Sequence, residues 1–205
     1  GEYGEGDQFI GVVVPNLRIV AKKHFDADFD TLRELLASPY HEYRLTALLA
    51  LTYRYAKLKD HTSRETCVNF YVSQVDAINN WDLVDLSCYK ILGHWLFDKD
   101  KQLLYDWAKE NHLWKQRIAM ISCMHFVKQG EFKDALAIAD LRQHHPHDLI
   151  HKAVGWILRE IGKEDEQLLV DYLTPRYKEM PRTMLRYAIE RFEEGKRKAF
   201  LNSTI

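Results

Sequence analysis

The stretch KQRIAMISC, residues 115–123, combines a basic start with an alanine, Ala119, inside an apolar run. A comparable arrangement occurs in YRLTALLAL (43–51), HKAVGWILR (151–159) and LRYAIERF (185–192). The corresponding alanines are Ala47, Ala153 and Ala188. Because a small side chain lets neighbouring helices approach closely, we interpret the four segments as copies of one repeated structural unit.

The spacing of these copies predicts a further one. Three of the alanines follow one another at intervals of 34 and 35 residues, whereas Ala47 precedes the next alanine by 72 residues, close to two periods. A copy is therefore expected near residue 83, where the chain reads NNWDLVD (79–85). Counting back one period of 34 from Ala119 places Asp85 where the other copies have alanine.

A period near 35 residues built from two helices is the signature of an α-helical solenoid, whose repeats bury their apolar faces by stacking. Apolar residues recur at i, i+3, i+4 and i+7 in nearly every segment, and no segment alternates long enough to predict a sheet. We expect an all-α solenoid, curved with a concave binding face, that forms one domain over residues 1–205. Pro15 is suited to the first turn of a helix reaching about Lys23, after the extended lead-in FIGVVVP (9–15). The other helices are expected near residues 28–37, 41–58, 62–77, 80–92, 99–110, 112–129, 131–142, 147–162, 164–173 and 181–194.

The composition excludes several classes of protein. With 46% apolar and 12% aromatic residues, the chain is expected to fold rather than to stay disordered. No apolar run approaches the roughly 20 residues of a membrane-spanning helix, and GEYGEGDQF (1–9) lacks the features of a signal peptide. We therefore expect a cytoplasmic protein with no membrane partner. The formal net charge of −1 gives no sign of nucleic-acid binding, so any basic surface must come from the arrangement of charges.

Other candidate sites are weaker. Cys67, Cys88 and Cys123 are odd in number and lie in apolar helical patterns, which indicates buried free thiols in a reducing compartment. The tail EEGKRKAF (193–200) has a short basic cluster that could touch phosphates, but such runs are more typical of solvated faces. There is no phosphate loop, no GxSxG elbow and no paired catalytic cysteine and histidine.

A group of histidines surrounds Pro146. His147 and His151 have the i, i+4 spacing of helical metal ligands, but no cysteine or carboxylate pattern completes a site. We expect a polar turn between repeats and no metal. The remaining members of the group are His144 and His145.

Asp85 is the residue that a packed helical array does not require. A carboxylate on a packing face loses hydration unless it is paired, hydrogen-bonded or open to water. One interpretation is an ion pair with a repeat arginine, most simply Arg117. The other is that Asp85 faces the groove of the solenoid and meets a cationic or electron-poor ligand there. Trp81, one turn earlier, would lie on the same face, and Trp156 could line the same concavity.

The chain resembles the AlkD-type DNA alkylation-repair glycosylases, which are built from HEAT-like helical repeats. The resemblance covers essentially the whole sequence and rests on several matches in the same order. The matching segments are GEYGEGDQFIGVVVPNLR (1–18), NNWDLVD (79–85), WKQRIAMIS (114–122), IHKAVGWILRE (150–160) and MPRTMLRYAIERF (180–192). The family usually has a further helix before the first of these segments, so we expect a helix that precedes Gly1 and helps to hold DNA.

The resemblance implies roles for individual residues. It makes Asp85 the catalytic carboxylate, Trp81 and Trp156 the aromatic walls beside the sugar of the damaged nucleotide, and Arg117 a ligand of backbone phosphate. Asp148 and Leu149 stand where the family can have an aromatic pair, which is a departure from its pattern. Other DNA contacts are expected from basic residues at the starts of the inner helices, namely Arg44, Lys115, Lys152 and Arg186.

The implied activity is hydrolysis of the N-glycosidic bond of cationic N3- or N7-alkylated purines, such as 3-methyladenine and 7-methylguanine, in duplex DNA. No cofactor is expected, the protein is expected to be a monomer, and the lesion is expected to stay outside a closed base-flipping pocket. Two alternatives stay open: a DNA-binding relative with little or no catalysis, and a helical-repeat scaffold that binds a protein or peptide.

Overall fold

The computed structural model describes residues 6–205, so the first five residues of GEYGEGDQF lie outside the described residues. The chain forms two compact units, and the boundary between them lies between Lys99 and Asp100. In the described part, regular structure is helical apart from one isolated parallel bridge between Gln8 and Tyr40. The prediction of an all-α helical-repeat fold is therefore confirmed, while the single domain over residues 1–205 stays a prediction. None of the described helices is both long and apolar enough to cross a membrane.

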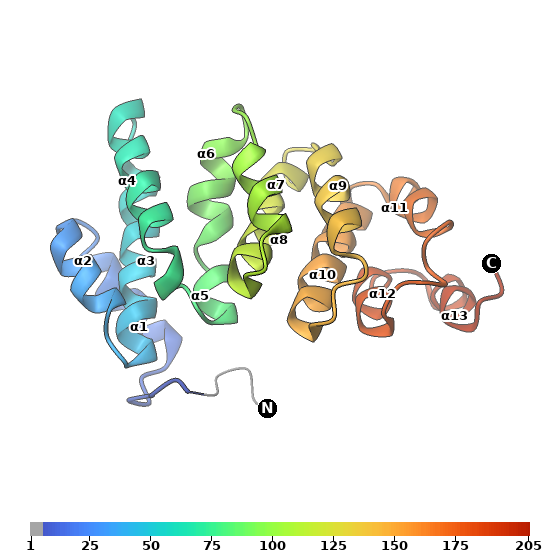
Figure 1. The fold of residues 1–205 in the computed structure, drawn as a ribbon, viewed down its shortest axis with the longest axis horizontal. Helices are drawn as coiled ribbons and strands as arrows, with labels where there is room; N and C mark the ends of the chain where they lie inside the picture. Colours follow the sequence, from blue (N-terminus) through green and yellow to red (C-terminus); the bar gives the residue numbers. More distant parts are fainter. Residues whose placement is uncertain (1–5) are drawn as a thin grey trace. The chain divides into compact units, whose positions relative to one another are not determined.

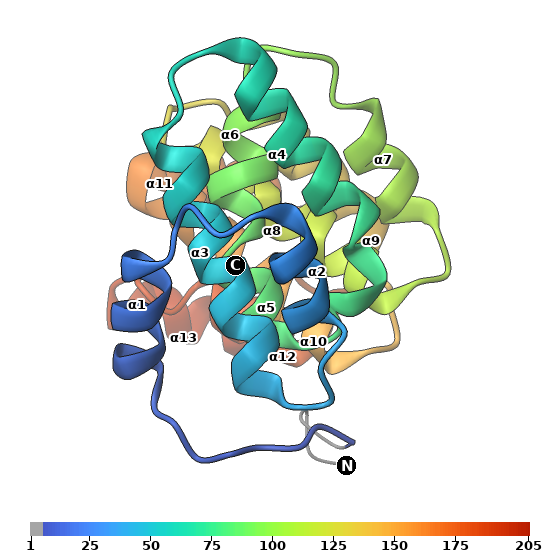
Figure 2. The ribbon, with the colours of Figure 1, turned by 90° about the vertical axis from the view of Figure 1, so that its left-hand side faces the viewer.

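The first unit is built around the helix α3 (His41–Lys57), most of whose side chains are buried. Two helices, α1 (Val14–Lys23) and α2 (Phe29–Leu36), pack on α3, as Figures 1 and 2 show. α4 (His61–Ser73) also contacts α3. The unit is completed by the short segments η1 (Val75–Ala77), α5 (Trp81–Asp85), η2 (Tyr89–Gly93) and α6 (His94–Leu96).

The starts of these helices follow from local sequence. Pro15 lies in the first turn of α1, where a missing backbone N–H costs no helical hydrogen bond. Asp28 caps α2 by accepting from the Thr31 amide at 2.7 Å. Asp60 caps α4 by accepting from the Ser63 amide at 2.8 Å. Residues 9–13 form no helix, as the sequence predicts, whereas Val14 already belongs to α1.

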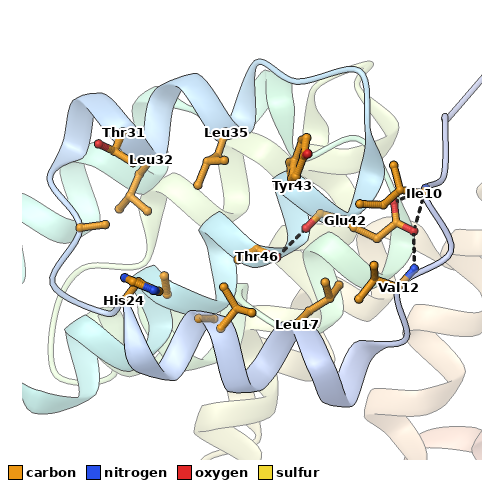
Figure 3. A pocket seen from close by; sticks show the side chains of 14 residues that line it. Ile10, Val12, Leu17, His24, Thr31, Leu32, Leu35, Glu42, Tyr43 and Thr46 are labelled. Carbon is orange, nitrogen blue, oxygen red and sulfur yellow. Dashed lines mark hydrogen bonds between the residues drawn. The ribbon is translucent and has the colours of Figure 1, made fainter.

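Packing among α1, α2 and α3 leaves an apolar cavity of about 400 Å³. Figure 3 shows Leu17 from α1 and Leu32 and Leu35 from α2 around it. Ile10 and Val12 of the extended lead-in lie at one end, next to Glu42 of α3. The lead-in is thus part of the wall of this cavity.

The expected helix over 80–92 is interrupted. α5 ends at Asp85, and η2 is a π-helical turn rather than an α-helix. The Ser87 hydroxyl is buried and donates to the Leu83 carbonyl at 2.5 Å. A serine that bonds the backbone four residues back often bends a helix, and this bond lies where the chain changes from α- to π-helical geometry.

The second unit contains α7 (Gln102–Lys109), α8 (Leu113–Val127), α9 (Lys133–Arg142), α10 (Asp148–Glu164), α11 (Glu166–Leu173), α12 (Arg182–Ala188) and α13 (Glu194–Asn202). α10 packs against both α8 and α12 (Figure 1). Between α10 and α12 the approach is close: a Cβ atom at Gly155 would lie 2.5 Å from Tyr187 Cβ and 2.6 Å from the Met184 carbonyl oxygen. The repeat alanines Ala47, Ala119, Ala153 and Ala188 are all buried, as their repeated position predicts.

The C-terminal end differs from the predicted helix over 181–194. α12 ends at Ala188, and a separate helix, α13, begins after Glu193. The Glu193 carboxylate caps α13 by accepting from the amides of Gly195 and Lys196 at 2.8 and 3.2 Å. α13 buries Phe200 against Tyr177 and keeps its charges exposed. The apolar periodicity of the sequence does not predict α13, because a single buried aromatic residue in a charged segment gives little periodic signal.

The cysteines behave as predicted. Cys67, Cys88 and Cys123 are buried thiols, and none of them forms a disulfide within the described residues. Burial raises the pKa of the Cys67 thiol, which keeps it protonated and unreactive.

Candidate active site

The short helix α5 carries both the aromatic and the acidic residue of NNWDLVD. Leu83 and Val84 are fully buried and hold one face of α5 in the core. Trp81 and Asp85, four residues apart, share another face. Trp81 is 44% exposed, whereas Asp85 is 9% exposed. The segment therefore presents an open indole one helical turn from a nearly buried carboxylate.

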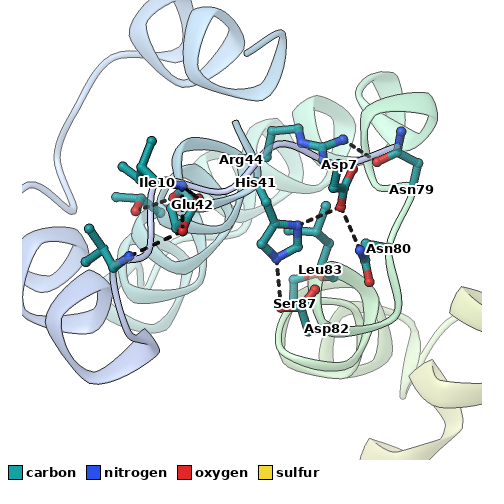
Figure 4. Close-up of polar contacts among 12 residues, drawn as sticks. Asp7, Ile10, His41, Glu42, Arg44, Asn79, Asn80, Asp82, Leu83 and Ser87 are labelled. Atoms are coloured by element: carbon teal, nitrogen blue, oxygen red, sulfur yellow. Dashed lines mark hydrogen bonds and ion pairs between the residues drawn. The ribbon is translucent and has the colours of Figure 1, made fainter. Parts of the chain in front are cut away.

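A polar network ties the start of this segment to α3 and to the lead-in (Figure 4). Asp7 is its centre: one carboxylate oxygen lies 2.5 Å from Nη2 of Arg44, and the other accepts from Nδ2 of Asn80 at 2.7 Å. Arg44 also donates to the side chain of Asn79. Two residues immediately before Trp81 are thereby fixed by side chains from elsewhere in the unit.

His41 completes the network. Its Nδ1 lies 3.0 Å from Asp7, and its Nε2 lies 2.8 Å from Asp82, the residue after Trp81. Burial acts to lower the pKa of His41, but the hydrogen bonds and charges of Asp82 and Asp7 raise the pKa above its usual value of 6.5. A protonated imidazole donates from both nitrogens, so His41 can bridge the two carboxylates.

The same ion pairs act on Asp7. Burial acts to raise the pKa of Asp7, but hydrogen bonds from Asn80, Arg44 and His41 lower it overall. The network is thus a set of buried charges that compensate one another, which is the condition for stable burial. It surrounds Trp81 with anchored neighbours on both sides in the sequence.

Glu42 holds the lead-in next to this network. Its carboxylate accepts from the amides of Ile10 at 3.0 Å, Gly11 at 2.8 Å and Val12 at 3.3 Å. Gly11 has a φ of 84°, a left-handed conformation that glycine adopts without steric cost and that a bound turn of this kind requires. Burial acts to raise the pKa of Glu42, but these amide donors lower it overall.

The remaining predicted site residues lie in the second unit. Arg117 of α8 is buried, and its guanidinium donates to the carbonyl of Leu149 in the first turn of α10. Trp156 of α10 is half-buried. Lys115 pairs with Glu110 at 2.7 Å.

Two further cations of the second unit differ in their surroundings. Lys152 pairs with Asp148 at 2.9 Å, one helical turn away within α10. Arg186 on α12 is exposed, and no ion pair or hydrogen bond of its side chain is found within the described chain. Arg186 is therefore the more available of the two for an external anion.

The structure thus groups Trp81, Asp85 and Arg44 in the first unit and the other five predicted residues in the second. The sequence predicts that Arg44 contacts DNA, but this residue is only 6% exposed and its side chain is already bound to Asp7 and Asn79. The sequence interpretation missed Asp7, His41, Asp82 and Glu42. No local spacing indicates these residues, because their partners lie 30 or more positions away in the sequence.

The histidine group forms the predicted turn between α9 and α10. His147 caps α10 by accepting from the Leu149 amide at 3.1 Å, and His145 accepts from the His147 amide at 3.0 Å. Burial, with the nearby charge of Arg142, lowers the pKa of His145. Over residues 6–205, no group of three or more histidine, cysteine or acidic side chains is arranged to hold a metal ion.

Comparison with known proteins gives the chain its family. A search of curated proteins finds no match. A solved structure described as a predicted DNA alkylation repair enzyme from Enterococcus faecalis is similar, with a TM-score of 0.72 and 14% sequence identity. The similarity covers 94% of this chain and 92% of that one, and at this identity it shows a shared fold. The family model for DNA alkylation repair enzymes matches residues 2–192. Since this match spans most of the sequence, the chain belongs to the DNA alkylation repair enzyme family.

Proposed function

We propose that the protein is a DNA glycosylase that acts as a monomer and excises cationic N3- or N7-alkylated purines from duplex DNA. The observation that carries the proposal is the pairing on α5 of a 44% exposed tryptophan with a 9% exposed carboxylate one turn away. Membership of the family supports a role in alkylation repair. The substrates and the roles of individual residues are the proposed part.

The chemistry suits a single carboxylate. An N3- or N7-alkylated purine is positively charged and leaves as a neutral base, so its departure needs little acid catalysis. As the C1′–N bond breaks, positive charge develops on the deoxyribose. A fixed negative charge at Asp85, largely shielded from water, would stabilise that charge more than an exposed carboxylate could. Water then adds to C1′ and loses a proton, which yields an abasic site and the free base.

Trp81 would contribute through its electron-rich ring face. A cation over a tryptophan is stabilised by about 1–2 kcal/mol when water is excluded. We propose Trp156 as a second aromatic wall with the same role. Both would favour a charged lesion over a neutral base, so selectivity would follow charge rather than shape.

DNA would be held by cations of the second unit. Arg186 is exposed, whereas Lys115 and Lys152 would exchange Glu110 and Asp148 for phosphate. Arg117 is proposed as the phosphate ligand near the lesion, and this contact would require its buried guanidinium to leave the Leu149 carbonyl. A direct phosphate contact by Arg44 would require its ion pair with Asp7 to open, so we assign Arg44 to positioning the Asn79–Asp85 segment. Affinity should then fall as salt rises.

The decisive experiment measures release of 7-methylguanine from a methylated duplex. Asp85→Asn keeps the size of the side chain and removes its charge, and we expect a loss of base release of 100-fold or more, about 2.7 kcal/mol or more of transition-state stabilisation. Asp26→Asn is the matched control, because Asp26 is exposed in the turn between α1 and α2. Equal release of 7-methylguanine by the wild type and Asp85→Asn would show that Asp85 is not the catalytic carboxylate. No base release by either protein would contradict the proposed glycosylase activity.

A second candidate is a DNA-binding protein without base release. The ion pair of Asp148 with Lys152 favours it, because an acidic residue at the start of α10 neutralises one of the proposed phosphate ligands. Salt-dependent binding to duplex DNA without liberation of any alkylated base would support this candidate.

A further inference from the structure

A second cavity lies at the other end of α3 from His41, among α3, α4 and the η2–α6 segment. It measures about 410 Å³. Tyr53 and Tyr55 come from α3, Arg64 from α4, Lys90 from η2, and His94 from the start of α6. No carboxylate is found among its described lining residues. Apart from Thr52 and Ala56, the cavity is lined by basic and aromatic side chains, and the proposed chemistry at Asp85 uses none of them.

Arg64 is oriented by one backbone hydrogen bond, which uses only one of its N–H donors. Its Nε donates to the Leu58 carbonyl at 3.0 Å, and its guanidinium lies 5.6 Å from the centre of the Tyr55 ring. A guanidinium has five N–H donors, so one backbone contact orients the group while leaving donors for an anion. Arg64 is also half-buried, which strengthens its interaction with a bound charge.

His94 supplies a directed donor. Its Nδ1 lies 2.9 Å from the hydroxyl of Tyr55. Burial raises the pKa of Tyr55 to about 12, so the hydroxyl keeps its proton and can donate to Nδ1. Burial, and then the charge of Arg64, lower the pKa of His94. A neutral imidazole that accepts at Nδ1 carries its proton on Nε2 and can donate from there.

The backbone around Lys90 is unusual. Lys90 lies in the π-helical turn η2, and His94 follows that turn directly. Short π-helical turns are rare and occur frequently at functional sites. Lys90 in this turn lines the same cavity as Arg64 and His94. The unusual backbone and the group of basic side chains therefore occur at the same place.

We propose that this cavity binds a phosphate monoester, with Arg64, Lys90 and His94 as ligands of the phosphate oxygens. Donors from α4 and from two positions of the continuous η2–α6 segment suit a tetrahedral oxyanion better than a planar carboxylate, which one guanidinium can bind alone. A monoester carries a charge of about −1.5 to −2 at neutral pH, which Arg64 and Lys90 can match. The half-exposed ring of Tyr53 is available beside the phosphate for an organic substituent.

Asp98 is the acidic group whose charge acts on His94 and Tyr55, and it pairs with Lys99 at 2.7 Å. That pairing reduces its repulsion of an anion. A bound phosphate should favour the protonated form of His94, so the pKa of His94 should rise when phosphate binds. Arg64 and Lys99 act on His94 in the opposite direction, so the increase depends on phosphate being present.

The test uses the full chain in chloride-poor buffer. Inorganic phosphate and deoxyadenosine monophosphate are titrated by calorimetry and by NMR of the histidine side chains. We expect saturable binding with a rise in the pKa of His94, and a loss of affinity of about tenfold or more in both Arg64→Gln and Lys90→Gln, about 1.4 kcal/mol each. Lys22→Gln, an exposed cation on α1, should bind as the wild type does.

The thermal unfolding midpoint of each variant shows whether it is folded. If Arg64→Gln is unfolded, Lys90→Gln decides. Absence of saturable binding, or equal affinity in Lys90→Gln and Lys22→Gln, would overturn the proposal.

A phosphate monoester can be free or can lie at the 5′ end of a DNA strand, and two duplexes of the same sequence separate these sources. One carries 5′-phosphates and the other carries 5′-hydroxyls. A preference for the phosphorylated duplex that Lys90→Gln removes assigns the site to a DNA end. Equal binding of both duplexes, with binding of the mononucleotide intact, assigns it to free nucleotides. Equal Lys90-dependent binding of both duplexes without any binding of phosphate or mononucleotide would instead contradict the proposal, because internal phosphodiesters would then be the ligand.

Discussion

The imidazole Nε2 of His41 lies 2.8 Å from a carboxylate oxygen of Asp82, the residue directly after Trp81. This bond crosses from the first turn of α3 to the first turn of α5. Together with the contact of Nδ1 to Asp7, it connects the residues just before the lead-in, the longest helix of the first unit and the proposed catalytic segment. The position of Trp81 should therefore depend on residues that themselves touch no substrate.

Replacing His41 by glutamine should weaken both stability and base release. Glutamine cannot bridge Asp7 and Asp82 as a cation, so Asp82 would lose its ion pair with His41 and Asp7 would keep only Arg44 and Asn80 as partners. We expect a loss of about 2 kcal/mol in the free energy of unfolding, measured by urea denaturation. His24→Gln is the control, since His24 is exposed at the end of α1. Equal stability of the two variants would contradict a role for His41 in holding α5.

The stability contributed by His41 should depend on pH. A group whose pKa is raised by folding stabilises the folded state fully below its unfolded pKa, near 6.5, and this contribution is lost as pH rises through the folded value. Asp7, whose pKa is lowered by folding, contributes above its ordinary value of 3.8 and loses its contribution as pH falls through the folded value. The difference in unfolding free energy between wild type and His41→Gln should therefore be larger at pH 5.5 than at pH 9. A difference that is the same at both pH values would show that His41 is not held as a cation.

Glu42→Gln should release the lead-in. The neutral amide keeps an acceptor oxygen but loses the charge that receives the amides of Ile10, Gly11 and Val12. Hydrogen bonds to a charged group stabilise by about 1.5–3 kcal/mol, so amide hydrogen exchange at these positions should accelerate by about tenfold or more. Glu34→Gln, on the exposed side of α2, should leave their exchange unchanged. Unchanged exchange in Glu42→Gln would mean that packing alone holds the lead-in.

Gly155→Ala should destabilise the second unit although alanine favours helices. The new methyl group would meet Tyr187 Cβ at 2.5 Å and the Met184 carbonyl oxygen at 2.6 Å, so α10 and α12 would have to separate. Overpacking of this kind costs about 1–3 kcal/mol. Gly162→Ala in the same helix is the matched control: its nearest neighbour is the flexible end of Leu169, which can move. Thermal unfolding should rank Gly155→Ala well below Gly162→Ala, and the reverse order would contradict the close approach.

Trp81→Ala tests the aromatic part of the proposed function. Because the ring is 44% exposed, its removal should cost little stability, while release of 7-methylguanine should fall about 5- to 30-fold, corresponding to about 1–2 kcal/mol. Trp81→Phe should recover part of the activity, because phenylalanine keeps a π face. An alanine variant with full activity would show that the exposed indole serves another purpose.

The fold could be predicted from sequence where the pattern is periodic. Ala47, Ala119, Ala153 and Ala188 share their place in the repeat and are buried together with the apolar residues around them. The break after Asp85 could not be predicted in this way, because it lies at a buried hydroxyl of Ser87 that contacts both the Leu83 carbonyl and the hydroxyl of Tyr71 in α4. Propensity and periodicity describe what a segment favours alone, and they omit such tertiary competition.

The residues of the candidate site also differ in whether the sequence alone could identify them. Asp85 could be singled out because it departs from a repeated alanine, and Trp81 because it lies one turn away. The positioning residues Asp7 and His41 could not be found, because each meets its partners over more than 30 positions of sequence. A network formed by long-range pairs leaves no local spacing to recognise.

The three buried thiols give the protein a built-in chemical reporter. Cys67 and Cys88 belong to the first unit and Cys123 to the second, and all three are inaccessible in the folded chain. A maleimide reagent should therefore modify each one only when the surrounding unit opens. Mass spectrometry of peptides after timed labelling in mild denaturant would give a separate opening rate for each half of the molecule, with no substitution or dye introduced beforehand.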